Sequence, residues 1–227
     1  MVFKQEAAFE AALINLLTEK YGWEPEILRY KTEEDLIQNW KQILFENNRD
    51  VDRLNDVPLT DSEMQQILDQ ITRLRTPLKL NGFINGKTVA VKRDNPADEL
   101  HCGKEVSLKI YDRQEIAAGQ SRYQIAEQPV FKARSSVLPN RRGDFMLLIN
   151  GMPLIHCELK RSGVDVSQAY NQIENMHMRA FSPDCLHLCR FLLPCSRMKR
   201  SILQIPVRTG SSTKIFTFTG RTSTMSH

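Results

Sequence analysis

The first third of the chain has the spacing of apolar residues that is typical of helices. Residues 4–20, a stretch that starts at Thr32 and a stretch that starts at Thr60 each repeat apolar residues about every 3.6 positions. Thr32 can cap the second stretch, and Thr60-Asp-Ser-Glu63 has the spacing of a capping box. Gly22 can end the first helix. The apolar face predicted for that helix consists of Phe9, Leu13, Leu16 and Leu17.

From residue 80 onward apolar and polar residues alternate, which is the pattern of strands. Asn85-Gly-Lys-Thr88 ends like a phosphate-binding loop, but Val89-Ala-Val91 continues as a strand, whereas such a loop must lead into a helix. We therefore expect a hairpin turn there and no nucleotide cofactor site. Tyr123 to Phe131 is predicted to be a strand that Pro129 interrupts.

The segment from Asp144 to Lys160 consists of two apolar strands joined at Asn150-Gly151, with charged residues at the open end. A hairpin brings Asp144 to the same end as Glu158. Side chains alternate along a strand, so Glu158 and Lys160 share one face. The opposite face is predicted to hold Ile155, Cys157 and Leu159. Two carboxylates beside a fixed cation suit the Mg²⁺-dependent hydrolysis of phosphodiesters.

Other residues near this hairpin are further candidates for the site. His156 shares the face of Glu158 and is a candidate ligand or base, although a lone histidine at a strand end is more often a polar packing residue. Gln172 lies on a final helix predicted from Ser167 to about Met178. Basic residues around the hairpin either contact phosphates or form an ordinary solvated surface. They are Arg134, Arg141, Arg142, Lys160, Arg161 and Arg179.

The composition is that of a globular chain and leaves the partner open. The 227 residues suffice for one large domain or two small ones, and 31 basic against 27 acidic residues give a net charge of +4. That charge permits a polyanionic partner without requiring one. No segment approaches the roughly 18 consecutive apolar residues of a membrane span, and the N-terminus lacks the apolar region of a signal peptide. We expect a cytoplasmic protein.

Several separated motifs resemble, in order, the nuclease core in the N-terminal part of the restriction (R, motor) subunit of type I restriction enzymes, within the PD-(D/E)xK superfamily. The resemblance covers about residues 1–180. The motifs are Leu54 to Thr60, Arg93-Asp94, Ile110 to Arg113, Gln128-Pro129, Arg142-Gly-Asp144, Asn150 to Lys160 and Gln168 to Gln172.

This resemblance implies an α/β (α+β) fold with a central mixed sheet flanked by helices and an N-terminal helical part. It implies that Asp144, Glu158 and the main-chain carbonyl of Leu159 bind Mg²⁺. Lys160 would orient or polarise the attacking water and steady the developing charge. The implied catalytic set also contains Gln172 and, on the first helix, Glu10 in preference to Glu6. The family's tyrosine four residues after the glutamine is replaced here by Met176.

The implied activity is cleavage of double-stranded DNA by an endonuclease domain that lacks the ATP-dependent motor domains. The implied partners are DNA and the methyltransferase and specificity subunits, with no membrane. One rival interpretation is a non-catalytic module that binds DNA or docks subunits. Another is an inert truncated product.

The family motifs stop after about residue 180. Cys185, His187, Cys189 and Cys195 suggest a zinc cluster, but their spacing matches no common closed site. Back-translated and read one base earlier, residues 189–195 and 218–227 can be written as peptides that are typical of the family. We therefore interpret 1–180 as the nuclease-like domain and 181–227 as an atypical tail, with the hypothesis of a frameshift near 178–182.

Overall fold

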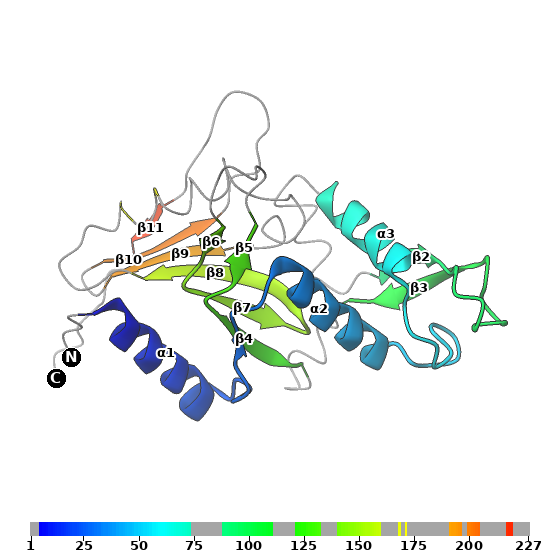
Figure 1. Cartoon of the computed structure of the whole chain (residues 1–227), viewed down its shortest axis with the longest axis horizontal. Helices are drawn as coiled ribbons and strands as arrows, with labels where there is room; N and C mark the ends of the chain where they lie inside the picture. Colours follow the sequence, from blue (N-terminus) through cyan, green and yellow to red (C-terminus); the bar gives the residue numbers. More distant parts are fainter. Residues whose placement is uncertain are drawn as a thin grey trace, which may run out of the picture.

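The structure is a computed structural model that describes residues 5–73, 88–110, 121–132, 140–159, 168 and 171, together with the backbone of three later strands at 191–196, 199–204 and 217–219. The elements combine helices with a mixed sheet, so the predicted α/β class is confirmed. In Figure 1, α1 (Glu6–Tyr21) lies beside the sheet at one end of the molecule. At the other end lie α3 (Asp61–Thr72) and the strands β2 (Thr88–Lys92) and β3 (Glu105–Lys109), and α2 (Glu33–Asn47) lies between.

The three predicted helices are confirmed, and local sequence explains their ends. Thr32 and Thr60 each accept a hydrogen bond from the third helical residue, whose carboxylate accepts one from the backbone of the threonine in return. Helix α1 ends at Gly22, which adopts a left-handed φ of 71°. None of the helices within the described ranges is long and apolar enough to span a membrane.

One part of the predicted face of α1 is wrong. Leu16 is 43% exposed, whereas Glu10 and Ile14 are buried. Phe9, Leu13 and Leu17 pack against the sheet as predicted. The buried stripe is therefore rotated around the helix, away from Leu16 and toward a charged residue.

The central sheet has both parallel and antiparallel neighbours among its described strands. Its order is β1-β4-β7-β8-β9-β10-β11, with parallel pairing of β1 to β4 and of β8 to β9. The bounds are β1 Leu28–Arg29, β4 Tyr123–Glu127, β7 Phe145–Ile149, β8 Met152–Leu159, β9 Phe191–Ser196, β10 Lys199–Gln204 and β11 Thr217–Thr219. The sheet thus contains strands from both sides of residue 180. The predicted domain boundary there, and the origin of residues 181–227, stay predictions.

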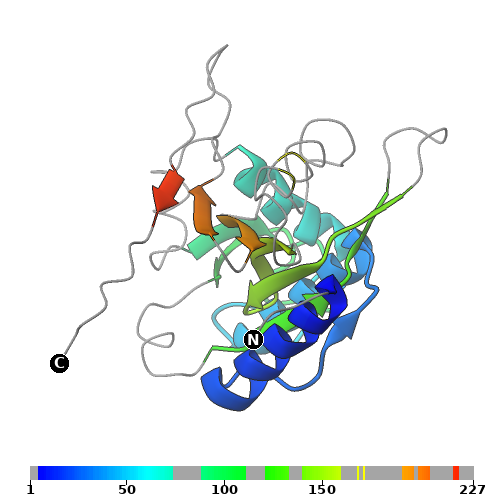
Figure 2. The same cartoon turned by 90° about the vertical axis from the view of Figure 1, so that its left-hand side faces the viewer.

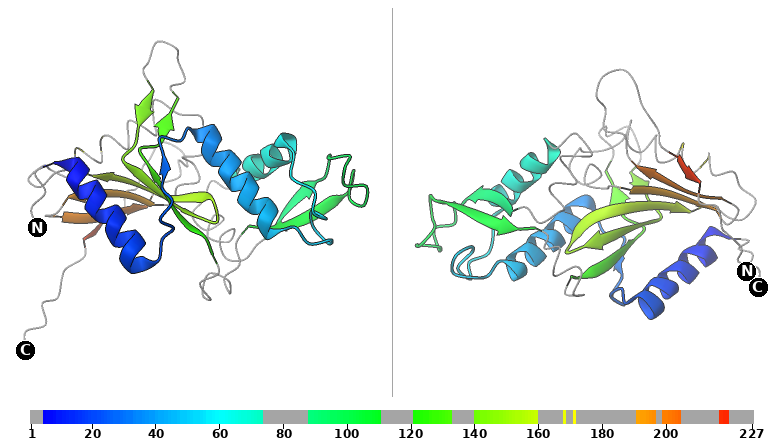
Figure 3. Two further views of the ribbon diagram at one scale, coloured as in Figure 1. Left: turned by 60° about the horizontal axis from the view of Figure 1, so that its bottom comes forward. Right: turned by 180° about the vertical axis from the view of Figure 1, so that it is seen from behind.

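Helices cover both faces of the sheet. Ile14 of α1 packs against one face, and Leu36 of α2 packs against the other. The α1 side contains Ile125, Phe145, Leu147, Cys157 and Leu159, and the α2 side contains Ala126, Phe131, Met146 and Leu148. The predicted orientation of Cys157 and Leu159, opposite to Glu158, is confirmed. Figures 2 and 3 show α1 running alongside the strands from three further directions.

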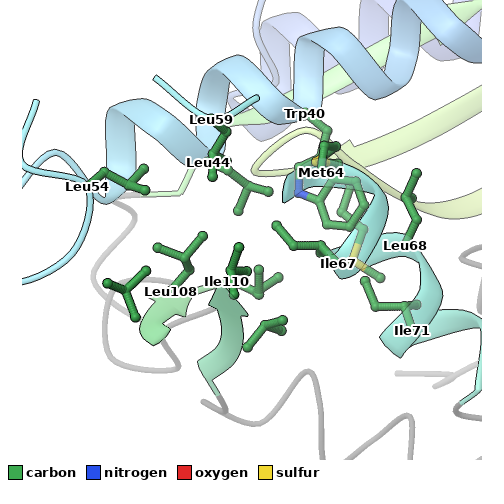
Figure 4. Close-up of a cluster of buried hydrophobic side chains, with 14 of the residues drawn as sticks. Trp40, Leu44, Leu54, Leu59, Met64, Ile67, Leu68, Ile71, Leu108 and Ile110 are labelled. Atoms are coloured by element: carbon green, nitrogen blue, oxygen red, sulfur yellow. The ribbon is translucent and has the colours of Figure 1, made fainter. Parts of the chain in front are cut away.

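A larger core lies between α2, α3 and a separate two-stranded sheet. This sheet pairs β2 (Thr88–Lys92) with β3 (Glu105–Lys109), as the alternating pattern predicts. Trp40 and Leu44 of α2 meet Met64 and Ile67 of α3 here (Figure 4). A third pair, β5 (Val130–Phe131) with β6 (Arg141–Arg142), follows the predicted break at Pro129.

A buried arginine joins α3 to the segment after β2. The Arg93 side chain is fully buried and donates to Glu63 Oε2 at 2.6 Å and Asp98 Oδ2 at 3.0 Å. It also donates to the carbonyl of Val57 at 3.0 Å. Glu63 in turn accepts from the backbone N–H groups of Thr60 and Asp94. Each buried charge therefore has several partners, which is the condition under which such charges are tolerated.

The turn between β7 and β8 packs against α2. Asn150 and Gly151 both have left-handed φ values, 50° and 81°, as the two-residue hairpin turn predicted from the sequence requires. The Asn150 side chain accepts from the N–H of Arg122 at 2.9 Å. A Cβ on Gly151 would lie 2.7 Å from the Cα of Trp40. Glycine is thus required both for the backbone angle and for the contact with the helix.

Within the hairpin, the register shifts by one residue. Ile149 pairs with Met152 and Leu148 with Pro153, but Leu147 pairs with Ile155, which leaves Leu154 as an extra residue in β8. This is a β-bulge. Pro153 has no N–H to donate to a regular ladder, so its place next to a bulge is expected.

We predict that Gly151→Ala destabilises the chain more than Gly22→Ala. Both changes place alanine at a left-handed φ, which costs about 1–2 kcal/mol. Only Gly151 has a backbone atom where the Cβ would go, and such overpacking adds about 1–3 kcal/mol. Urea unfolding of the two variants measures the difference. Equal losses would contradict the packing argument.

We predict that Arg93→Ala lowers the free energy of unfolding by about 3–5 kcal/mol, because Glu63 and Asp98 would remain buried without their cation. Arg49→Ala is the matched control. It removes a pair with Asp56 in which both side chains are more than half exposed, so it should change stability much less. Urea unfolding at neutral pH measures both, and a similar loss in the two variants would exclude a special role for Arg93.

Candidate functional site

The two predicted carboxylates lie across from each other at the open end of the β7–β8 hairpin. Phe145 pairs with Cys157 and Met146 with His156, so the next step of the same register brings Asp144 opposite Glu158. The N–H of Leu159 donates a hydrogen bond to Asp144 Oδ2, which joins the Asp144 side chain to β8. The predicted meeting of these strand ends is therefore confirmed. Asp144 is half-buried, whereas Glu158 is fully buried.

Glu158 has one oxygen in a hydrogen bond and one without a partner. Its Oε1 lies 3.0 Å from Nε2 of His156, and both side chains are 0% exposed. Its Oε2 has no hydrogen-bond partner within the described part of the chain. A buried carboxylate oxygen without a partner is costly, so Glu158 is suited to bind a group that brings positive charge.

Helix α1 brings a third carboxylate to this end of the sheet. Glu10 is only 7% exposed. Burial raises the pKa of its carboxyl, and the negative charges of Glu127 and Glu158 raise it further, while a hydrogen bond with the Gln128 side chain lowers it. The sequence-based preference for Glu10 thus coincides with a position in the electrostatic field of Glu158. Its catalytic role stays a prediction.

Gln128 connects three elements around the site. Its N–H donates to the carbonyl of Asp144 at 2.7 Å, and its side-chain oxygen lies 3.4 Å from Nη1 of Arg142. Its φ of 48° is left-handed, a conformation that costs a residue other than glycine energy and that is concentrated at functional sites. The Gln128-Pro129 motif was visible in the sequence, but its position opposite Asp144 required the pairing of β4 with β7.

An exposed basic surface adjoins this end of the sheet. Arg141 and Arg142 are exposed on β6, three and two residues before Asp144. The Arg142 guanidinium lies 5.5 Å from the centre of the Tyr30 ring, and Tyr30 is 56% exposed. These positions are accessible to a phosphate. Of the other basic candidates, Arg134, Lys160, Arg161 and Arg179 lie outside the described residues.

The remaining predicted site residues are only partly covered. Leu159 is the last described residue of β8, and Lys160 follows it outside the described residues. Gln172 also lies outside them, although residues 168 and 171 of the predicted final helix are helical. The contributions of Lys160 and Gln172 therefore stay predictions.

The donor atoms suit a hard divalent cation. In the described ranges, no three or more His, Cys, Asp or Glu side chains are grouped so as to hold a metal ion. The predicted ligand set, however, has two carboxylates and one main-chain carbonyl, and oxygen ligands of this kind are those that Mg²⁺ prefers. The unpartnered Oε2 of Glu158 is the observation that fits such a cation.

Comparison with known proteins identifies relatives. Residues 3–216 match the family described as type I restriction enzyme R protein N terminus. A type I restriction enzyme endonuclease subunit of Staphylococcus saprophyticus subsp. saprophyticus is 33% identical over 177 residues, which cover 76% of this chain and 16% of that protein. Another, from Staphylococcus aureus, is 29% identical over 184 residues, which cover 80% of this chain and 17% of that protein. The chain thus spans only a small part of these relatives.

We predict that Glu10→Gln stabilises the chain at neutral pH when divalent cations are removed by EDTA. Because the pKa of the Glu10 carboxyl is raised in the folded chain, the contribution of Glu10 to folding stability is fully present below its ordinary pKa of 4.5 and is lost as the pH rises through the folded-state pKa. Glutamine removes this loss, so the gain should be large at pH 7 and vanish at about pH 4.

Thermal unfolding from pH 4 to pH 8 measures the effect of Glu10→Gln. Glu19→Gln is the control, because Glu19 is exposed on the same helix, and it should leave the pH profile unchanged. A Glu10→Gln variant that is less stable than the parent at neutral pH would contradict the electrostatic argument.

Proposed function

Because the chain belongs to the family of type I restriction enzyme R protein N termini, we propose that it is the endonuclease domain of such a subunit. The proposed reaction is Mg²⁺-dependent hydrolysis of phosphodiester bonds in double-stranded DNA. The observation that supports it best is the register of β7 and β8, in which Asp144 comes opposite Glu158 at one strand end. The names of the relatives as endonuclease subunits agree with this proposal.

In this proposal Asp144, Glu158 and the main-chain carbonyl of Leu159 hold the metal ion. Bound Mg²⁺ would supply a Lewis acid that polarises the phosphate and makes water a better nucleophile. The chain's own contribution is to keep the ligands in place. Asp144 is held by the N–H of Leu159, and Glu158 is held through its Oε1, so neither carboxylate has to be ordered when the cation binds.

The other proposed residues act on the water and on the charge of the reaction. Lys160 directly follows Leu159 in the sequence and is proposed to orient or polarise the water and to stabilise negative charge on the phosphate. Glu10 adds an acidic group near Glu158, and its raised pKa lets it hold a proton at a pH where an ordinary glutamate would be ionised. Gln172 is proposed to complete this set.

The partners follow from the same proposal. The substrate is double-stranded DNA, whose phosphates the exposed Arg141 and Arg142 can reach beside the site. The relatives are about six times as long as the matched segment, which agrees with a domain that works together with ATP-dependent motor domains outside this chain. The methyltransferase and specificity subunits are the proposed protein partners, and the cytoplasm is the proposed location.

A non-catalytic docking module is the second candidate. Two observations favour it: the Glu158 side chain is fully buried, and the described residues contain no group of three or more potential metal-binding side chains. In such a module the fold would bind DNA or the other subunits without turnover. Metal binding and DNA nicking distinguish the two candidates.

We predict that the full chain binds Mn²⁺ and nicks supercoiled plasmid DNA in Mg²⁺. Asp144→Asn and Glu158→Gln should weaken Mn²⁺ binding in calorimetry and lower nicking by at least about 100-fold. Lys160→Ala should lower nicking to a similar extent while it leaves Mn²⁺ binding intact, because lysine is not a proposed ligand.

Glu105→Gln, at an exposed position of β3, is the control for these variants and should change neither measurement. A folded parent chain that binds DNA but neither binds Mn²⁺ nor nicks would reject the nuclease proposal and favour the docking module. Binding of Mn²⁺ without nicking would leave the metal site in place and show that cleavage needs the remainder of the subunit.

A further inference from the structure

Gly143, the residue before Asp144, has no space for a side chain. A Cβ built there would lie 2.7 Å from Nε2 of His156 and 3.3 Å from Cε2 of Phe131. Its φ is not among the positive values of this chain, so the backbone angle does not explain the glycine. The explanation is the close approach of the His156 ring, which occupies the volume that any larger residue would need.

The His156 ring is held by its surroundings on several sides. It is fully buried, and its centroid lies 5.9 Å from that of the Phe131 ring, with the two planes 40° apart. The atom that lies against Gly143, Nε2, is the same atom that lies 3.0 Å from Glu158 Oε1. Space at Gly143 and the hydrogen bond to Glu158 therefore depend on one ring position.

The direction of this hydrogen bond follows from chemistry. A carboxylate that acts as a metal ligand is ionised and can only accept hydrogen bonds, so Nε2 of His156 carries the hydrogen and donates it to Oε1. The bond fixes Glu158 through one oxygen. Its other oxygen, Oε2, has no partner in the described part of the chain and is the one left for a cation.

We propose that His156 is a positioning residue for Glu158 and that Gly143 is glycine because the histidine ring must fit against it. This inference rests on the proposed metal-dependent function. In this arrangement Gly143, in the segment before β7, provides the space, and β8 provides both the hydrogen-bond donor His156 and the ligand Glu158. Hydrogen bonds from outside the ligand set commonly tune metal affinity about 10–100-fold.

A histidine that only packed would be a poor choice at this position. Nδ1 of the ring is buried and has no hydrogen-bond partner among the described residues, which costs free energy. A leucine would fill a similar volume without that cost. The presence of histidine here is therefore better explained by the hydrogen bond that it makes than by the space that it fills.

Three variants of the full chain separate positioning from packing. His156→Leu fills the space with an apolar side chain but removes the hydrogen-bond donor, whereas His156→Gln keeps a side-chain N–H donor. Gly143→Ala changes neither His156 nor Glu158, but its added Cβ displaces the His156 ring. Gly103→Ala is the control, since Gly103 has a left-handed φ of 80° and nothing within 4 Å of the added Cβ. It should lower stability without changing the site.

The readouts are the Kd for Mn²⁺ by calorimetry, in the absence of DNA, and thermal unfolding of the same samples. His156→Leu should weaken Mn²⁺ binding by about 10–100-fold and should also lower the unfolding temperature, because Oε1 of the buried Glu158 loses its hydrogen-bond donor. Gly143→Ala should weaken binding similarly. His156→Gln should restore binding to within a few-fold of the parent.

Unchanged Mn²⁺ affinity in folded His156→Leu and Gly143→Ala variants would overturn the positioning role and leave the proposed function intact. If His156→Leu does not fold, Gly143→Ala and His156→Gln decide the question by the same criterion. A parent chain that binds no Mn²⁺ would instead overturn the proposed function, and the positioning role with it.

Discussion

The contact between the β7–β8 turn and helix α2 determines where the site can form. Gly151 lies so close to the backbone of Trp40 that no side chain fits between them. Trp40 belongs to the large core shared with α3 and the β2–β3 sheet, so the turn is fixed to the largest cluster of buried apolar residues in the described part of the chain. The strands then extend from this fixed point to the end where Asp144 and Glu158 meet.

At that end the chain tolerates unfavourable electrostatics that the Arg93 cluster avoids. Arg93 satisfies Glu63 and Asp98 with direct ion pairs. Glu10 and Glu158, by contrast, are buried near each other, with a raised pKa for Glu10 and an oxygen of Glu158 that lacks a partner. Both clusters contain buried carboxylates, but among the described residues the first alone contains its own cation. Locally unfavourable free energy of this kind, which a stable surrounding structure can tolerate, is typical of functional sites.

The sequence predicts those features that depend on local signals. Thr32 and Thr60 mark helix starts because a cap needs only residues close in sequence, and Asn150-Gly151 marks the hairpin because the turn needs left-handed angles. The exposure of Leu16 was not predictable, because it depends on which side of α1 faces the sheet. The closeness of Gly143 to His156 was equally hidden, since it arises from the pairing of two strands. The shared face of His156 and Glu158 was the one available signal.

The bulge at Leu154 has a consequence for how this hairpin tolerates change in length. Counted outward from the turn, where Ile149 pairs with Met152, an unbroken ladder would bring Asp144 opposite Cys157. The extra residue in β8 moves every later pair by one, and only this shift brings Asp144 opposite Glu158. The alignment of the two carboxylates thus depends on Leu154, ten positions from Asp144 along the chain, staying outside the regular pairing, rather than on the chemistry of its side chain. Substitutions at Leu154 that keep the bulge preserve this alignment, and deletion of Leu154 also preserves it, because a regular ladder then has the same later pairs. Loss of the bulge with Leu154 retained would instead bring Asp144 opposite Cys157 and turn Glu158 toward the α1 side of the sheet.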